Sequence, residues 1–142
     1  MSFFYEADTV SFPKIKRRKT SAWIKSVIES HCKRAGKIVY IFCSDGEILR
    51  INKQYLQHDY YTDIITFDYT EGGIVSGDLF ISLDTVRTNS EKFKTDYDEE
   101  LHRVMIHGIL HLCGFKDKSP EDEKLMREME NDALRNFFSH EV

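Results

Sequence analysis

Two histidines, His107 and His111, lie four residues apart in the segment HGILHLCGFKD, which spans positions 107 to 117. In a helix this spacing places both imidazoles on one face, one turn apart and about 40° apart around the axis. Two imidazoles so placed suit the binding of a single metal ion. The pair alone is weak evidence, because two surface histidines at this spacing are a common chance outcome.

The residues after the pair strengthen the metal interpretation. Gly114 is able to adopt the left-handed conformation that ends a helix, so the chain can turn back and bring the Asp117 carboxylate to both imidazoles. Three nitrogen or oxygen ligands with a fourth position left to water are typical of catalytic zinc, whereas structural sites usually have four protein ligands. We therefore predict a metal site formed by His107, His111 and Asp117, with the two histidines as catalytic residues.

Two neighbours of ligand type are expected to miss this site. Cys113 lies about 160° around the helix from His111, and His102 lies about 140° from His107. We interpret Cys113 as a core residue. The chain has an odd number of cysteines and no CxxC spacing, so all three are predicted to be buried thiols: Cys32, Cys43 and Cys113.

Sequence patterns predict five helices. The histidines belong to a helix over about residues 98–113, and the last helix starts with Ser119 as N-cap and Pro120 at its first position. Thr20 is predicted to cap an earlier helix, which ends before Gly36. Ser44 is predicted to cap another, with Glu47 three residues later. The fifth helix is expected over about residues 84–93.

Four short apolar segments are predicted strands: residues 3–6, 37–43, 63–69 and 76–83. The last two are separated by Gly72 and Gly73 and should form an antiparallel hairpin. Crossovers through helices should make the other strands parallel. The expected fold is a single α+β domain over residues 1–142, with a small mixed sheet of about four strands packed with about five helices.

The composition limits the functional classes. With 142 residues, 41% of them hydrophobic, the chain is able to build a core, and its net charge of −4 is unlike that of a generic nucleic-acid binder. One local exception is a run of basic residues, which either contacts a polyanion or forms a solvated linker. The run consists of Lys14, Lys16, Arg17, Arg18 and Lys19.

The chain shows no sign of a membrane location. No stretch approaches the roughly 18 apolar residues of a membrane span, and Glu6 and Asp8 follow the first residues too closely for a signal peptide. We expect a cytoplasmic protein without a membrane partner. Its oligomeric state stays open.

Three ordered blocks of the sequence resemble the YbeY family, bacterial metal-dependent endoribonucleases of ribosomal RNA maturation. The family pattern HGxLHLxGxDH matches this chain at positions 107, 108, 110, 111, 112 and 114. Upstream, TDIITF at positions 62–67 is similar to the family's TDVLSF, and GDLFIS at positions 77–82 is similar to its GDIxIS. The resemblance covers roughly residues 37–135.

The resemblance implies a zinc-dependent endoribonuclease that cuts single-stranded RNA in ribosomal RNA maturation and ribosome quality control, with ribosomal RNA and ribosomal subunits as partners. Two positions depart from the family pattern. Asp117 stands where the third metal-binding histidine is expected, and this harder ligand could favour another divalent metal. Leu56 stands where the family usually has an arginine. Lys53 or His58 could supply charge there, and Arg50 could also make a bidentate phosphate contact.

Such a metal would lower the pKa of its bound water for attack on phosphorus, although attack by the RNA 2′-hydroxyl is equally compatible. Gly108 replaces the glutamate of HExxH metalloproteases, which argues against peptide hydrolysis. Two alternatives remain: a metal-dependent hydrolase of another ester or amide, and a non-catalytic ribosome-assembly factor. Thr62 and Asp63 could simply close a turn, and Tyr60 and Tyr61 are candidates for stacking on bases.

Overall fold

Four strands form one mixed sheet in the computed structural model, which describes residues 2–56 and 62–139. The strands are β1 (Ser2–Ala7), β2 (Arg34–Cys43), β3 (Ile64–Asp68) and β4 (Ile74–Ser82). Their order across the sheet is β1-β2-β4-β3; β1 and β4 run parallel to β2, and β3 is antiparallel to β4. The predicted hairpin and the predicted parallel pairs are therefore confirmed.

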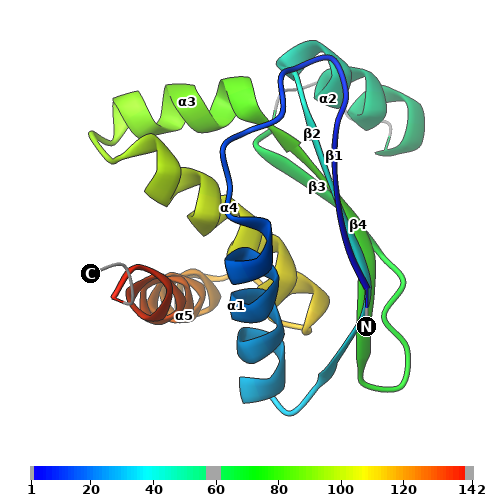
Figure 1. Cartoon of the computed structure of the whole chain (residues 1–142), viewed down its shortest axis with the longest axis vertical. Coiled ribbons are helices and arrows are strands. Elements are labelled where there is room, and N and C mark those ends of the chain that lie inside the picture. Colours follow the sequence, from blue (N-terminus) through cyan, green and yellow to red (C-terminus); the bar gives the residue numbers. More distant parts are fainter. Residues whose placement is uncertain (1, 57–61, 140–142) are drawn as a thin grey trace.

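Within the described residues, five α-helices accompany the sheet, as predicted. They are α1 (Arg17–Ser30), α2 (Asp45–Ile51), α3 (Leu83–Lys92), α4 (Tyr97–Leu112) and α5 (Pro120–Phe138), and a π-helical turn, η1 (Asn52–Leu56), follows α2. Figure 1 shows α1, α4 and α5 together on one side of the sheet, with α2 at one end of it. No described helix combines the length and apolar character needed to cross a bilayer.

Helix α4 is held between the sheet and the other helices. Alternate residues of β2, namely Ile38, Tyr40 and Phe42, are fully buried, as the period of a strand with one face toward a core requires. The Tyr40 hydroxyl donates a hydrogen bond of 2.9 Å to the backbone carbonyl of Met105 in α4. This contact ties the helix that carries the two histidines directly to the central strand.

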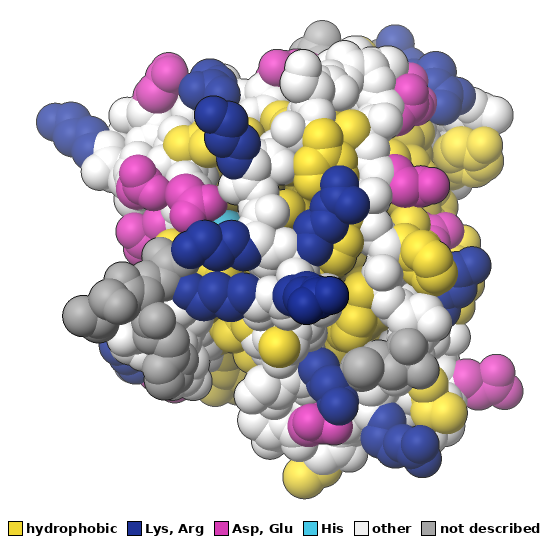
Figure 2. All heavy atoms as spheres, in the orientation of Figure 1, with side chains coloured by type: hydrophobic (Ala, Val, Ile, Leu, Met, Phe, Trp, Pro, Cys, Tyr) yellow, Lys and Arg dark blue, Asp and Glu magenta, His cyan; other side chains and the backbone are white. Residues whose placement is uncertain are grey.

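Helix α1 starts earlier than predicted. Its N-cap is Lys16, without a side-chain cap, and Thr20 is fully buried inside the helix, so the prediction of Thr20 as the cap is wrong. Arginine and lysine are good helix formers, which explains why the helix extends upstream into the basic run. Figure 2 shows Lys and Arg side chains spread over the middle of this face of the molecule, with hydrophobic side chains between them.

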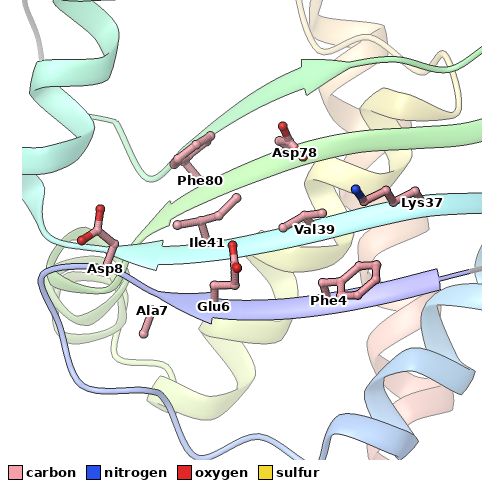
Figure 3. Close-up of a pocket in the computed structure, with 9 residues that line it drawn as sticks. All are labelled: Phe4, Glu6, Ala7, Asp8, Lys37, Val39, Ile41, Asp78 and Phe80. Atoms are coloured by element: carbon pink, nitrogen blue, oxygen red, sulfur yellow. The ribbon is translucent and has the colours of Figure 1, made fainter.

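The described residues cover the opposite face of the sheet only in part. A second apolar cluster of Cys43, Ile48, Ile51 and Ile65 lies where α2 packs on it. Beyond that cluster the sheet surface is an open groove of about 710 Å³. Figure 3 shows its lining residues, with Lys37 and Asp8 at opposite ends of an apolar strip that includes Val39 and Ile41.

One cysteine differs from its prediction. Cys43 and Cys113 are buried, as expected, but Cys32 is exposed. It lies between α1 and β2 with a φ angle of 62°, in the turn that joins the two elements. The prediction of three buried thiols is therefore wrong at Cys32, because turn residues lie at the surface whatever their side chain.

Candidate metal centre

Gly108 allows α4 to lie close to the sheet between the two histidines. A Cβ atom at this position would lie 2.4 Å from Leu79 Cδ2 and 2.7 Å from Ile64 Cδ1, both of which belong to strands. A side chain here would meet the ends of these two side chains, which would have to move to make room for it. The glycine in HGILH therefore avoids crowding between α4 and the sheet, and the absence of a glutamate at this position is consistent with that packing.

The end of α4 brings Asp117 back toward the helix. Gly114 has a φ angle of 102°, and the Phe115 amide donates to the Leu110 carbonyl at 3.1 Å, which closes the helix as predicted. Helix α5 then starts at Pro120, with the Ser119 hydroxyl accepting from the Asp122 amide at 3.1 Å. Asp117 is thus held in a short connection between two well-defined helix ends.

The three predicted ligands converge. His107 Nε2 lies 3.0 Å from His111 Nε2, and Asp117 Oδ2 lies 3.4 Å and 3.3 Å from these two nitrogens, respectively. The three donor atoms thus form a nearly equilateral triangle. All three side chains are partly exposed, so solvent or a substrate has access to the triangle.

These distances fit a tetrahedral metal site. Ligand bonds of about 2.0–2.1 Å in tetrahedral geometry put neighbouring donor atoms about 3.3 Å apart. The three edges of the triangle lie within a few tenths of an ångström of that value. His107, His111 and Asp117 are therefore able to hold a metal ion together, with room for further ligands on the open side.

A buried carboxylate behind the triangle was missed in the sequence. Glu130 of α5 places Oε2 2.6 Å from His107 Nδ1, and its Oε1 accepts from Arg103 Nη1 at 3.0 Å. Glu130 lies on the buried stripe of α5, in step with Met126, Ala133 and Phe137. A charged residue on an apolar stripe was the available sequence signal.

Burial and charge shift the pKa values of His107 and Glu130 in opposite directions. Burial of His107 would lower its pKa, but the hydrogen bond and the charge of Glu130 outweigh burial and hold its pKa above the usual value. Burial would likewise raise the pKa of Glu130, yet His107 and Arg103 hold it below its usual value. Burial raises the pKa of the Asp63 carboxyl above its usual value, and the nearby charge of His107 offsets part of that rise.

The triangle opens into a groove of about 430 Å³ between the end of α4 and the first turns of α5. Charged side chains of both signs line it, including Glu123, Lys124 and Arg127. The acidic residues at the start of α5 also stabilise the positive end of that helix. The groove gives a ligand direct access to His107 and Asp117.

The residues expected to miss the site do so. Burial raises the pKa of the Cys113 thiol to about 11, and the residue belongs to the core. His102 is only 2% exposed and stacks on Phe137, with 4.5 Å between ring centroids. Its Nδ1 lies 2.7 Å from the Asp98 carbonyl, four residues back along the helix.

None of the predicted RNA-binding residues lines the groove beside the triangle. Lys14 and Lys16 precede α1, and Arg17, Arg18 and Lys19 form its first turn. Arg17 lies over the ring of Phe12 at 4.3 Å, and Lys19 lies over Phe137 at 4.4 Å. Figure 2 shows only a small patch of histidine surface on the face that carries α1.

Arg50 lies on α2 and is already engaged. Its Nε donates to both carboxylate oxygens of Glu47 at 3.1 Å, and its Nη1 donates to Gln54. Contact with a phosphate would therefore compete with this pair. Leu56 is exposed in η1, while His58, Tyr60 and Tyr61 lie outside the described residues.

Comparisons with known proteins agree with this architecture. The family model described as Endoribonuclease YbeY matches residues 6–138. Curated proteins named Endoribonuclease YbeY are similar along most of the chain. The one from Parabacteroides distasonis is 63% identical over 134 residues, which is 94% of either chain. The one from Bacteroides thetaiotaomicron is 62% identical over 134 residues, covering 94% of this chain and 98% of the relative.

A solution structure of a Thermotoga maritima protein has the same fold. It superposes with a TM-score of 0.68 at 22% sequence identity, covering 98% of this chain and 90% of the other. The structural match supports the strand order and the helical layer described above. Together with the family model and the relatives at more than 60% identity, it leads to one conclusion: the chain belongs to the Endoribonuclease YbeY family.

Proposed function

We propose that this protein is a metal-dependent endoribonuclease that cuts single-stranded RNA during ribosomal RNA maturation and ribosome quality control. The observation that carries the proposal is the triangle of donor atoms formed by His107, His111 and Asp117, with edges of 3.0 to 3.4 Å beside an open groove. The endoribonuclease name of the family supports the same reaction. Its partners are ribosomal RNA and ribosomal subunits, and it acts in the cytoplasm, where these subunits mature.

The proposed cofactor is one zinc ion. Two imidazole nitrogens and one carboxylate oxygen suit zinc, and the carboxylate also suits harder divalent ions, so Asp117 is the ligand that sets metal preference. When bound, such an ion supplies Lewis acidity toward water and toward a phosphoryl oxygen. Asp117 adds a negative charge at a position where a histidine would add none. The ligand atoms of His107 and His111 would be their Nε2 nitrogens, and both nitrogens face Asp117.

The proposed RNA contact is the start of α1. Three cations in its first turn lie at the positive end of the helix dipole, so the local potential attracts phosphate. Arg17, Arg18 and Lys25 also line a groove of about 600 Å³ together with Phe3, Phe4 and Tyr5. Aromatic rings beside cations suit single strands, because bases stack while phosphates pair. Arg50 remains a predicted contact that would first have to leave Glu47.

The test is cleavage of a single-stranded RNA oligonucleotide by metal-free protein and by protein reloaded with zinc, manganese or magnesium. We expect no cleavage without metal and restored cleavage with zinc. The His107→Ala variant should remain inactive with every metal. The matched control is His31→Ala, which removes a partly exposed imidazole outside the triangle and should keep full activity.

The alternatives correspond to distinct results. Metal binding without RNA cleavage under any condition would favour a non-catalytic assembly factor. Hydrolysis of small esters or amides with indifference to RNA would favour a different hydrolase. Double-stranded RNA and single-stranded DNA serve as comparison substrates, and efficient cleavage of either would contradict the proposed single-strand RNA specificity.

A further inference from the structure

Glu130 uses both of its carboxylate oxygens inside the protein. It is 5% exposed, and its two oxygens bond two different residues of α4, His107 at 2.6 Å and Arg103 at 3.0 Å. The Arg103 guanidinium is itself fixed, because Nη2 donates to Asn131 Oδ1 at 2.8 Å. Arg103 therefore fixes the position of the Glu130 carboxylate, and the carboxylate contacts His107 from that position.

The contact falls on the nitrogen of His107 that faces away from the triangle. A neutral imidazole carries its hydrogen on one nitrogen and its lone pair on the other, and a ligand needs the lone pair on the metal side. An acceptor at Nδ1 selects the form with Nδ1–H and leaves the Nε2 lone pair free. Nε2 is the atom that lies 3.0 Å from His111 and 3.4 Å from Asp117.

We propose that Glu130 is a positioning residue that fixes the tautomer and ring orientation of His107 for metal binding, and that Arg103 holds Glu130 in place. The inference rests on the metal site of the proposed function and adds a residue from α5 to it. Carboxylates that orient a metal-binding histidine in this way typically change metal affinity by 10- to 100-fold when removed.

If Glu130 had a purely structural role, the expected result would be different. Arg103 and Glu130 also join α4 to α5, and removing one partner of a buried ion pair is destabilising because the other charge loses its partner. If joining the helices were its only role, replacing Glu130 would change stability without changing metal affinity. The 2.6 Å contact to His107 is the observation that such a role leaves unexplained.

The experiment measures zinc affinity of the whole protein by competition with a chromophoric chelator, for wild type, Glu130→Gln and Glu130→Leu. Leucine removes both acceptors and should weaken zinc binding by about 10- to 100-fold. Glutamine keeps a neutral acceptor and should lose less affinity than leucine. The control is Phe137→Leu, which loosens the same helix at its other end and should bind zinc like wild type.

The second readout is the Nδ1–H proton of His107 in the zinc-loaded protein, observed by NMR. Wild type and Glu130→Gln should show a slowly exchanging Nδ1–H, and Glu130→Leu should lose its protection from exchange. If Glu130→Leu folds and binds zinc as tightly as Phe137→Leu, the positioning role is wrong. Should Glu130→Leu fail to fold, wild-type affinity in Glu130→Gln together with an unprotected Nδ1–H in wild type overturns the inference. Absence of zinc binding in wild type would instead overturn the proposed function.

Discussion

The two ends of the interface between α4 and α5 are built from different chemistry. At one end His102 stacks on Phe137, and Trp23 of α1 donates to the Ala133 carbonyl at 2.8 Å. At the other end His107 contacts Glu130 and faces Asp117. The two histidines are five residues apart on the same helix, yet one is enclosed by rings and the other by carboxylates.

The difference shows that neighbours decide what a histidine does. His102 contributes a flat ring to an aromatic cluster, and burial there keeps it from any ligand role. His107 has one nitrogen held by a carboxylate and the other directed into an open groove. The aromatic end packs the helices together, and this packing holds the candidate ligand atoms of the polar end in place.

The largest expected effect is at Asp117, which completes the polar end. Asp117→Ala leaves two ligands, so metal content should fall close to zero and RNA cleavage to background. Asp117→His restores three ligands and should retain metal and cleavage. Because histidine adds no negative charge, its pH–rate profile should shift toward acid. Metal analysis and cleavage across pH check this, and equal cleavage by all three proteins would show that Asp117 is not a ligand.

The aromatic end should control stability and leave the metal site intact. Phe137 is buried between Trp23 and His102, so Phe137→Ala should lower the free energy of unfolding by about 3–5 kcal/mol. Zinc affinity of the folded variant, measured at low temperature, should stay within about threefold of wild type. Urea unfolding and a zinc titration test both parts. A tenfold loss of zinc affinity would mean that the two ends do not act separately.

The basic run should affect RNA binding more than chemistry. Replacing Lys14, Lys16, Arg17 and Arg18 by glutamine should flatten the dependence of log affinity on log salt by about 0.7 per lost phosphate contact. Cleavage at saturating RNA should be nearly unchanged, because none of these residues lines the groove beside the triangle. The control replaces basic residues elsewhere, Lys33, Arg34, Lys92 and Lys94. An unchanged slope would leave the run as solvated surface.

The smallest expected effect concerns the thiols. Burial raises the pKa of Cys113 to about 11 and of Cys43 to about 12, so thiolate is scarce at pH 8 and reagent access is poor. Only the exposed Cys32 should react rapidly with a thiol reagent in native protein. The Cys113→Ser variant should keep its metal. Rapid reaction of two or more thiols, or loss of metal in Cys113→Ser, would contradict the placement of Cys113 in the core.

Local signals explain which features could be predicted from the sequence. Ser119 with Pro120 marks the start of α5, Gly114 marks the end of α4, and Gly72 with Gly73 marks the hairpin, since each feature depends on neighbouring residues alone. The turn after Gly114 was enough to predict the position of Asp117. Thr20 misled because a good capping residue followed three residues that themselves favour helix.

Long-range contacts explain what was missed. Glu130 contacts His107 across 23 residues of sequence, and nothing near Glu130 indicates which side chain it meets. A carboxylate on a buried helical stripe does predict that some partner exists, because an isolated buried charge is costly. The close approach of Leu79 and Ile64 to Gly108 likewise depends on how the sheet packs on α4. The sequence therefore predicted the candidate ligands, whereas the residues that support them became apparent only in the fold.

X-ray absorption spectroscopy of the zinc-loaded protein tests the central claim most directly, because it reports the atoms bound to the metal. We predict one zinc per chain, with two imidazole nitrogens and oxygen ligands at about 2.0–2.1 Å and no sulfur. In Asp117→His the spectrum should change to three imidazoles. A sulfur ligand in wild type, or a single imidazole, would contradict a metal site formed by His107, His111 and Asp117.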